Sequence, residues 1–158
     1  MKYKNQSGRY RRGIGISSVY HGCGFTGAGE RDLIKAVFKL HKRADDTVEI
    51  LAAAVDMGQG VKTAFRKIAA SVLDLPVDRV IIVNPDTDRV PNSGPTVASR
   101  SVMVVGKLIE RAAKRLKADW KPGEDQLIIE HYVHPDFMVP WDLATFSGDP
   151  YQIGRAHV

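Results

Sequence analysis

Two short segments of this chain place small residues and hydrogen-bonding side chains directly before stretches with helical periodicity. They are residues 56–60, with the sequence DMGQG, and residues 91–101, with the sequence PNSGPTVASRS. A helix that begins after such a segment directs unpaired backbone N–H groups and the positive end of its dipole toward a ligand. Both segments therefore have the chemistry of an anion-binding site.

The first segment centres on Gln59, which has Gly58 and Gly60 on either side. Glycine lets the backbone turn without a Cβ clash and lets a ligand approach closely, and the glutamine amide is both a donor and an acceptor. Such a loop could bind a polar ring or an oxo group. The competing interpretation is an ordinary strand-to-helix turn with Gln59 in solvent.

The second segment is richer in polar groups. Thr96, Ser99 and Ser101 supply hydroxyls, and Arg100 supplies a planar cation with five donors. Together they suit a phosphate or a pterin-like heterocycle. The competing interpretation is an ordinary helix N-cap by Thr96 or Ser93, with the remaining hydroxyls in solvent.

The elements that would position these loops can be predicted from hydrophobic periodicity. Residues 13–20, 34–40 and 48–54 are predicted as strands that can pair in sequence, with a hairpin turn at residues 43–46 between the last two. Residues 61–73 carry apolar side chains at three- and four-residue spacing and are predicted as a helix.

The second half of the chain repeats the alternation of strand and helix. Residues 79–83 are β-branched and are predicted as a strand, which makes the helix before them part of a crossover unit. A second helix is predicted over residues 97–117, and a further strand over residues 127–133. The expected fold class is α+β: a mostly antiparallel sheet with two main helices packed on one face and the two loops at the helix N-termini.

Composition limits the class of protein. The chain has 158 residues, of which 44% are hydrophobic, so a single domain with an ordinary core is expected over residues 13–158, after a mobile basic lead-in at residues 1–12. A single cysteine excludes an internal disulfide framework and a cysteine-based zinc or iron–sulfur site within this sequence. The strand-like residues 153–158 at the end of the sequence suggest truncation of a longer protein.

Charge and hydropathy bear on partners and location. The formal charge of +5 invites a nucleic-acid interpretation, but part of the excess lies in the lead-in and no basic strand rich in aromatic residues accompanies it, so nucleic acid is not the expected partner. No signal peptide and no membrane span are apparent. We therefore expect a soluble cytoplasmic protein without a membrane partner.

Several segments of the sequence carry a family resemblance. Residues 55–63, 75–76, 85–88 and 91–101 resemble the large, molybdenum-cofactor-binding subunit of the xanthine dehydrogenase and aldehyde oxidase family. Residues 21–30 and 146–151 are similar to flanking segments of bacterial members. The resemblance covers most of the chain.

The resemblance implies a cofactor and a function. The cofactor is molybdopterin with molybdenum, either as such or as the cytosine dinucleotide, in a hydroxylase that transfers a water-derived oxygen to purines, other heteroaromatic rings or aldehydes. Iron–sulfur clusters and FAD would lie on other domains or subunits, which together with the remainder of the molybdenum subunit are the implied partners. The implied cofactor-binding residues are Gly58, Gln59, Gly60, Thr96, Ala98, Ser99, Arg100 and Ser101.

Two parts of the family pattern are absent from this sequence. The preceding cofactor-binding domain and the later loop with the catalytic glutamate are missing, so the chain alone should be inactive, with no catalytic residue and no protein ligand to the metal. Glu30, which follows a Gly-Ala-Gly sequence, is expected to form loop hydrogen bonds or to be a solvated charge rather than the catalytic base. The alternative function is a non-catalytic domain that binds a nucleotide or a partner subunit through the same loops.

Three pairs of residues resemble chemical sites but are predicted not to be such. His21 and Cys23 are neighbours in a glycine-rich loop and lack a third orienting group, so the expected role is packing beneath the loop. Asp86 and Asp88 are two carboxylates, which fall short of a calcium site, and are expected to shape a turn. His131 and His134 lie three residues apart on a strand and point to opposite faces, so they are expected to occupy separate positions.

Overall fold

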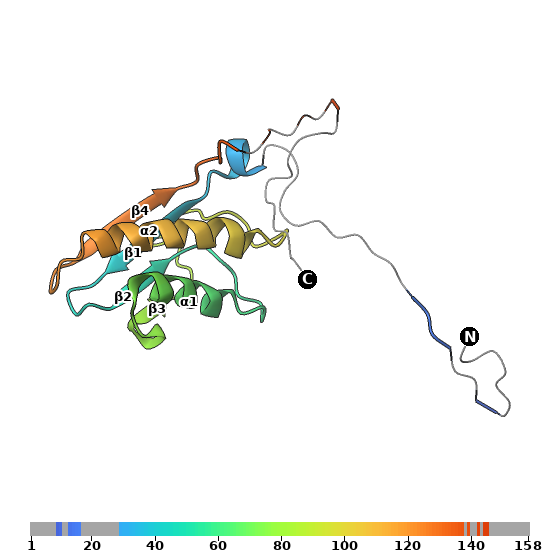
Figure 1. Cartoon of the computed structure of the whole chain (residues 1–158), viewed down its shortest axis with the longest axis horizontal. Coiled ribbons are helices and arrows are strands. Elements are labelled where there is room, and N and C mark those ends of the chain that lie inside the picture. The colour runs from blue at the N-terminus through green and yellow to red at the C-terminus, as the bar shows by residue number, and fades with distance from the viewer. Residues whose placement is uncertain are drawn as a thin grey trace.

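The protein folds as a small sheet with helices on one of its faces (Figure 1). The computed structural model describes residues 9–10, 13–16, 29–137, 139, 142 and 144–145. In chain order the elements are η1 (Gly29–Ile34), β1 (Val37–Lys42), β2 (Val48–Leu51), α1 (Val61–Leu73), η2 (Val77–Arg79), β3 (Val80–Ile82), η3 (Ser101–Val105), α2 (Gly106–Ala118) and β4 (Gln126–His131).

The strands form one mixed sheet in the order β3-β2-β1-β4. Strand β1 is antiparallel to both of its neighbours, and β2 is parallel to β3. The β1–β2 hairpin and the β2–α1–β3 crossover were both predicted from the sequence and are confirmed. The α+β class is confirmed as well, with one parallel pairing inside the otherwise antiparallel sheet.

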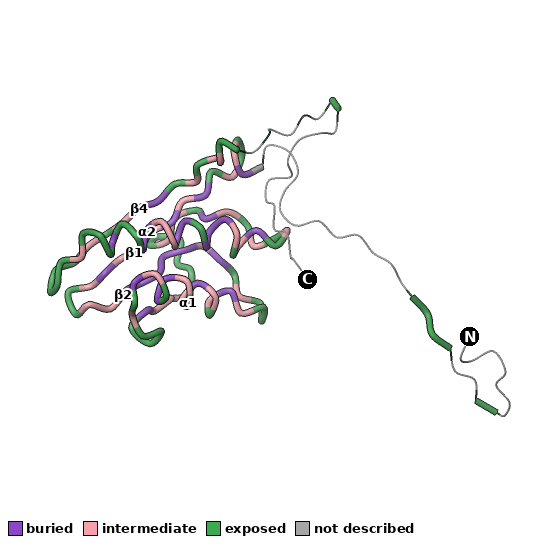
Figure 2. The backbone as a smooth tube through the Cα atoms, in the orientation of Figure 1, coloured by how far each residue is buried: buried purple, intermediate pink, exposed green. Residues whose placement is uncertain are grey.

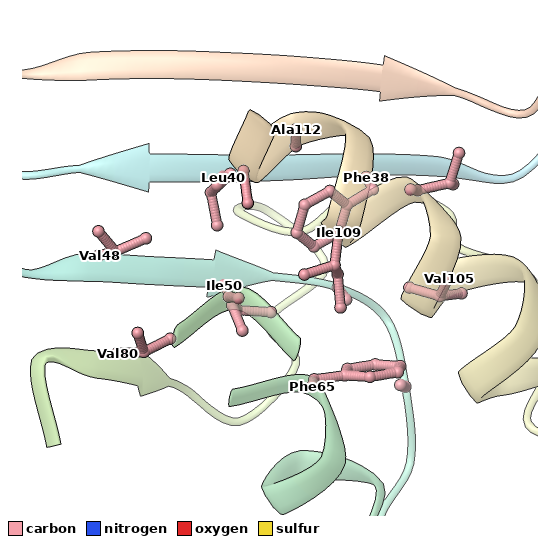
Figure 3. Close-up of a cluster of buried hydrophobic side chains, with 14 of the residues drawn as sticks. Phe38, Leu40, Val48, Ile50, Phe65, Val80, Val105, Ile109 and Ala112 are labelled. Atoms are coloured by element: carbon pink, nitrogen blue, oxygen red, sulfur yellow. The ribbon is translucent and has the colours of Figure 1, made fainter. Parts of the chain in front are cut away.

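The core lies between the sheet and the two long helices (Figure 3). Phe38 and Leu40 alternate with half-buried residues along β1, so that one face of the strand points to the helices. Phe65 of α1 and Ile109 of α2 are fully buried against that face. Figure 2 shows buried stretches along the strands and the inner helix sides, and exposed ones in the turns.

The helices contact each other closely at Gly106. A Cβ placed on Gly106 would lie 3.1 Å from Cδ1 of Ile68 on α1. The atom nearest to this position therefore belongs to the other helix and not to the sheet. None of the helices in the part of the chain that the structure describes is long and apolar enough to span a bilayer.

Two sequence predictions fail in detail. Residues 13–16 are not in a strand, and the rest of the predicted strand over residues 13–20 lies outside the described residues. The second long helix was predicted from residue 97, but residues 98–99 form a turn and the α-helical part begins at Gly106, after a π-helical turn. Residues 21–28 and 146–158 also lie outside the described residues.

Buried charges mark two places outside the loops of interest. Lys42 is fully buried, and its Nζ donates to the carbonyl oxygens of Lys121 at 2.8 Å and Glu124 at 2.9 Å. Glu130 on β4 is also buried, and it pairs with Arg111 and Arg115 on α2. The bonds of Lys42 hold β1 to the loop that follows α2, and the ion pairs of Glu130 hold β4 to α2.

Candidate functional site

Both polar loops lie at the end of the sheet where α1 and α2 begin (Figure 1). The first loop connects the end of β2 to the start of α1, and the second leads from β3 to η3 and α2. The β1–β2 turn and the loop after α2 lie at the opposite end, where Gly123 N donates to Asp46 Oδ1 at 3.4 Å. The topology therefore brings the two predicted binding segments together.

Asp56 organises the first loop. Its Oδ1 accepts hydrogen bonds from Gly58 N at 3.0 Å and Gly60 N at 3.4 Å, and its Oδ2 accepts one from Lys62 N at 3.1 Å. These bonds hold the pKa of Asp56 below its usual value, and the bond from Lys62 N is the largest cause. The carboxylate thus caps α1, so several amides that were expected to point at a ligand already have a partner.

Gln59 folds back over its own loop. Its Oε1 accepts a hydrogen bond from Met57 N at 2.7 Å, and its Nε2 donates to the Val55 carbonyl oxygen at 2.9 Å. The residue is nevertheless exposed. The two sequence interpretations therefore combine: Gln59 stabilises a strand-to-helix turn, and it also presents one side of its side chain to the space beside the loop.

The second loop contains a strained turn. Ala98 and Ser99 have φ values of 52° and 54°, and the N–H of Arg100 closes the turn by donating to the Val97 carbonyl oxygen at 3.1 Å. Left-handed backbone is unfavourable for residues with a Cβ, and it persists where the surrounding structure enforces it. Within the described part of the chain, the N–H groups of Ala98 and Ser99 have no protein acceptor.

Hydroxyl groups join the two loops. Thr96 Oγ1 accepts a hydrogen bond from Val55 N at 3.0 Å. Ser93, which is fully buried, accepts one from Ala53 N at 3.1 Å and donates to the Val37 carbonyl oxygen at 2.9 Å. The loops are therefore two parts of one hydrogen-bonded assembly.

A cleft of about 450 Å³ opens between the loops. Its walls combine hydroxyls and backbone from the second loop with the start of α1 from the first. Six of the eight predicted cofactor-binding residues line it, and Gly58 lies next to it in the first loop. The lining residues are Met57, Gln59, Gly60, Val61, Ala64, Thr96, Val97, Ala98, Ser99, Ser101 and Val102.

Arg100 is the exception among the predicted site residues. Its side chain is 1% exposed and does not line the cleft. Its Nε and Nη2 donate to both carboxylate oxygens of Glu30, which is itself fully buried. In this structure the Arg100 side chain therefore faces Glu30 instead of the cleft, and Glu30 is an ion-pair partner rather than a solvated charge.

Asp56 was not among the predicted site residues, nor was Glu30 expected to be buried. An Asp two positions before a glycine at a helix start is a signal for the role of Asp56, because Asp side chains cap neighbouring amides. No comparable signal links Glu30 to a residue 70 positions later. Long-range ion pairs leave no local pattern in one sequence.

The pairs predicted not to be chemical sites are only partly described. Asp86 Oδ1 accepts a hydrogen bond from Asp88 N at 3.0 Å, which confirms that Asp86 shapes a turn. The described residues contain no cluster of three or more side chains suited to a metal ion. His21 and Cys23 lie outside the described residues.

Comparison with known proteins identifies the family of the chain. Residues 1–132 match the family described as molybdopterin cofactor-binding domain. The chain belongs to this family. The match includes both polar loops and every residue that lines the cleft.

The relatives of this molybdopterin cofactor-binding domain are much longer proteins. Xanthine dehydrogenase of Dictyostelium discoideum is 34% identical over 119 residues, which is 75% of this chain and 8% of that protein. Xanthine dehydrogenase 1 of Arabidopsis thaliana is 31% identical over 112 residues, or 71% of this chain and 8% of that protein. This domain therefore spans less than a tenth of these relatives.

A solved structure supports the fold. The aldehyde oxidoreductase of Desulfovibrio gigas superposes with a TM-score of 0.60 over 83% of this chain and 16% of its own, with 23% sequence identity. At this identity the likeness concerns the fold alone. The arrangement of β1, β2, α1, β3, α2 and β4 is thus one that occurs inside a larger enzyme chain.

Proposed function

We propose that this domain holds molybdopterin in the cleft between residues 56–60 and residues 96–101, as one part of a molybdenum hydroxylase. The observation that carries the proposal is the convergence of Gln59, Thr96 and Ser99 on one cleft at the starts of two helices. Membership of the family supports the choice of cofactor. When bound, the cofactor supplies the metal centre for oxygen transfer to purines, other heteroaromatic rings or aldehydes.

The cleft offers donors that suit the pterin ring and its phosphate. The N–H groups of Ala98 and Ser99, which no described residue accepts, can donate to phosphate oxygens. The hydroxyls of Ser99 and Ser101 can donate beside them. Gln59 contributes the opposite wall, where its side chain amide is held by its own loop. These groups bind and orient the cofactor without any cation from Arg100.

The remainder of the enzyme belongs to the same proposal. Iron–sulfur and flavin groups would lie on other domains or subunits, and the cofactor would be molybdopterin or its cytosine dinucleotide. The open cleft covers one side of a ligand, so we expect the isolated chain to carry no stoichiometric molybdenum and to be inactive. The cytoplasm is the proposed location, because the remaining parts and the cofactor must assemble with this domain.

The test is cofactor content after co-expression of the chain with the remainder of the molybdenum subunit. Gln59→Ala and Ser99→Ala should each lower pterin and molybdenum per chain at least about threefold, the loss expected for one hydrogen bond in a binding site. Normal loading of both variants would overturn the assignment of the cleft.

Two residues outside the cleft give matched controls. Gln126 also folds over a loop: its Oε1 accepts from Lys121 N at 2.9 Å and its Nε2 donates to the Asp119 carbonyl oxygen at 2.5 Å. It lies past the far end of α2, a helix of 13 residues and about 20 Å in length. Gln126→Ala and Ser71→Ala, the latter on the exposed side of α1, should leave loading unchanged.

A further inference from the structure

We propose that Glu30 and Arg100 are a positioning pair, whose buried ion pair holds the Ala98–Ser99 turn in the cleft wall and thereby sets cofactor retention without contact with the cofactor. This inference rests on the proposed function of the cleft. The first observation is the geometry of the pair. Nε and Nη2 of Arg100 donate to the two carboxylate oxygens of Glu30 in a bidentate arrangement, and the distance from Nη2 to Oε2 is 3.0 Å.

The same guanidinium also holds the loop that precedes it. Nη1 donates to the Pro95 carbonyl oxygen at 2.9 Å, and Nη2 donates to the Ser93 carbonyl oxygen at 3.0 Å. These carbonyls lie on the N-terminal side of the strained turn, and the Arg100 backbone closes its C-terminal side. The side chain therefore ties the two ends of residues 93–100 together.

The packing leaves the loop little room to move. The Gly94 backbone lies against the guanidinium, since a Cβ at this position would come within 2.8 Å of Nη2 of Arg100 and 2.5 Å of Cγ2 of Ile34. Glu30 is 0% exposed and Arg100 is 1% exposed. Outward movement of the turn would have to separate buried charges, which is strongly unfavourable. The pair can therefore enforce left-handed backbone at Ala98 and Ser99.

Glu130 offers a matched control. It is another buried glutamate, 3% exposed, and it pairs with Arg111 at 3.0 Å and Arg115 at 2.7 Å. These partners lie on α2 and not in the turn. Loss of either glutamate charge should lower the stability of the chain, so stability alone cannot distinguish a positioning role from a structural one.

The first measurement is amide exchange in the 158-residue chain, with global stability measured in parallel by urea denaturation. In Glu30→Gln the Arg100 amide, which closes the turn, should exchange at least roughly tenfold faster, as expected when a hydrogen bond to a charged group is lost. Glu130→Gln should leave this amide protected. Arg100→Lys, which keeps the charge but not the bidentate fork, should behave like Glu30→Gln.

The second measurement is pterin content in the co-expressed subunit. Glu30→Gln should lose several-fold more pterin than Glu130→Gln, and unchanged exchange or equal loading of the two variants would overturn the positioning role. If Glu30→Gln loads normally while Gln59→Ala and Ser99→Ala do not, the pair is refuted and the proposed function stands. If none of these variants lowers loading, the proposed function fails, and the exchange result alone then decides whether the pair holds the turn.

Discussion

The hydroxyl oxygen of Thr96 accepts a hydrogen bond from the backbone N–H of Val55, with 3.0 Å between the two heavy atoms. This bond joins the second loop, which contains Thr96, to Val55, the residue directly before the first loop. The Val55 carbonyl oxygen accepts the side chain of Gln59. One residue therefore contacts both of the loops proposed to hold the cofactor.

Thr96→Val tests this connection. The substitution keeps the shape of the side chain but removes the acceptor, and we expect a loss of about 0.5–1 kcal/mol in the free energy of unfolding. Cofactor content should fall by more than this small loss explains, because the two walls are no longer joined. Urea denaturation and pterin analysis measure the two effects. Thr96→Ser, which keeps the hydroxyl, should resemble the parent in both; equal pterin content in the Val and Ser variants would contradict the prediction.

Asp56→Asn tests the cap of α1 and its dependence on pH. Hydrogen bonds from Lys62, Gly58 and Gly60 hold the pKa of Asp56 below its ordinary value of 3.8 in the folded protein. The stabilisation is therefore present above pH values near 3.8 and is lost as the pH falls through the lower folded-state pKa.

The stability gap between parent and Asp56→Asn should accordingly be largest at neutral pH and should narrow toward pH 2. Urea midpoints at several pH values in this range measure it. Asp142→Asn is a suitable comparison, because hydrogen bonds from Thr145 and Ala144 also lower the pKa of Asp142, but this residue is far from α1 in sequence. A gap at Asp56 that stays constant with pH would rule out the capping role of the carboxylate.

Gly94→Ala should be strongly destabilising. Gly94 has a φ of +79°, and an added Cβ would lie 2.5 Å from Ile34 and 2.8 Å from Arg100. Strained backbone and overpacking together should cost about 2–4 kcal/mol. Gly123→Ala is the matched control, because Gly123 has a φ of +74° but no atom within 4 Å of the added Cβ. Only the backbone contribution, about 1–2 kcal/mol, is expected there; equal losses at both positions would show that the side chains packed around Gly94 move to accept the added Cβ.

Lys42→Met should lower stability without affecting the cleft. The Nζ of Lys42 lies 4.8 Å from the centre of the Trp120 ring and also pairs with Asp46 at 2.6 Å. Methionine fills a similar volume, but it leaves the carbonyl oxygens of Arg43, Lys121 and Glu124 without this donor, so we expect a loss of about 1–3 kcal/mol in the free energy of unfolding. Urea denaturation followed by tryptophan fluorescence measures it. Pterin content should stay at the parent level, because Lys42 lies at the end of the sheet opposite the cleft. Reduced pterin content in a folded Lys42→Met protein would contradict this prediction.

The elements of the fold follow from periodicity in the sequence. Helix α1 was predicted with its observed bounds, because apolar residues recur along one face and a proline follows shortly after. The parallel pairing of β2 and β3 follows from the helix between them. The strand predicted over residues 13–20 is not present at residues 13–16, because alternation alone does not guarantee a neighbouring strand with which to pair.

The candidate site was predictable in its position but not in its details. Glycines and hydroxyls before two helices located both loops, and the structure brings them to one cleft. The left-handed turn at Ala98 and Ser99 contradicts the preference of these residue types, so local propensity could not predict it. The burial of Arg100 depends on Glu30, which lies in a different part of the chain.

The close approach of Gly106 to Ile68 has a consequence for the spacing of the two long helices. Val102, which lines the cleft, lies four residues before Gly106 in η3, and the missing side chain at Gly106 lets the start of α2 lie close to Ile68 of α1. A larger residue at this position would require the end of the Ile68 side chain to move or the two helices to separate slightly.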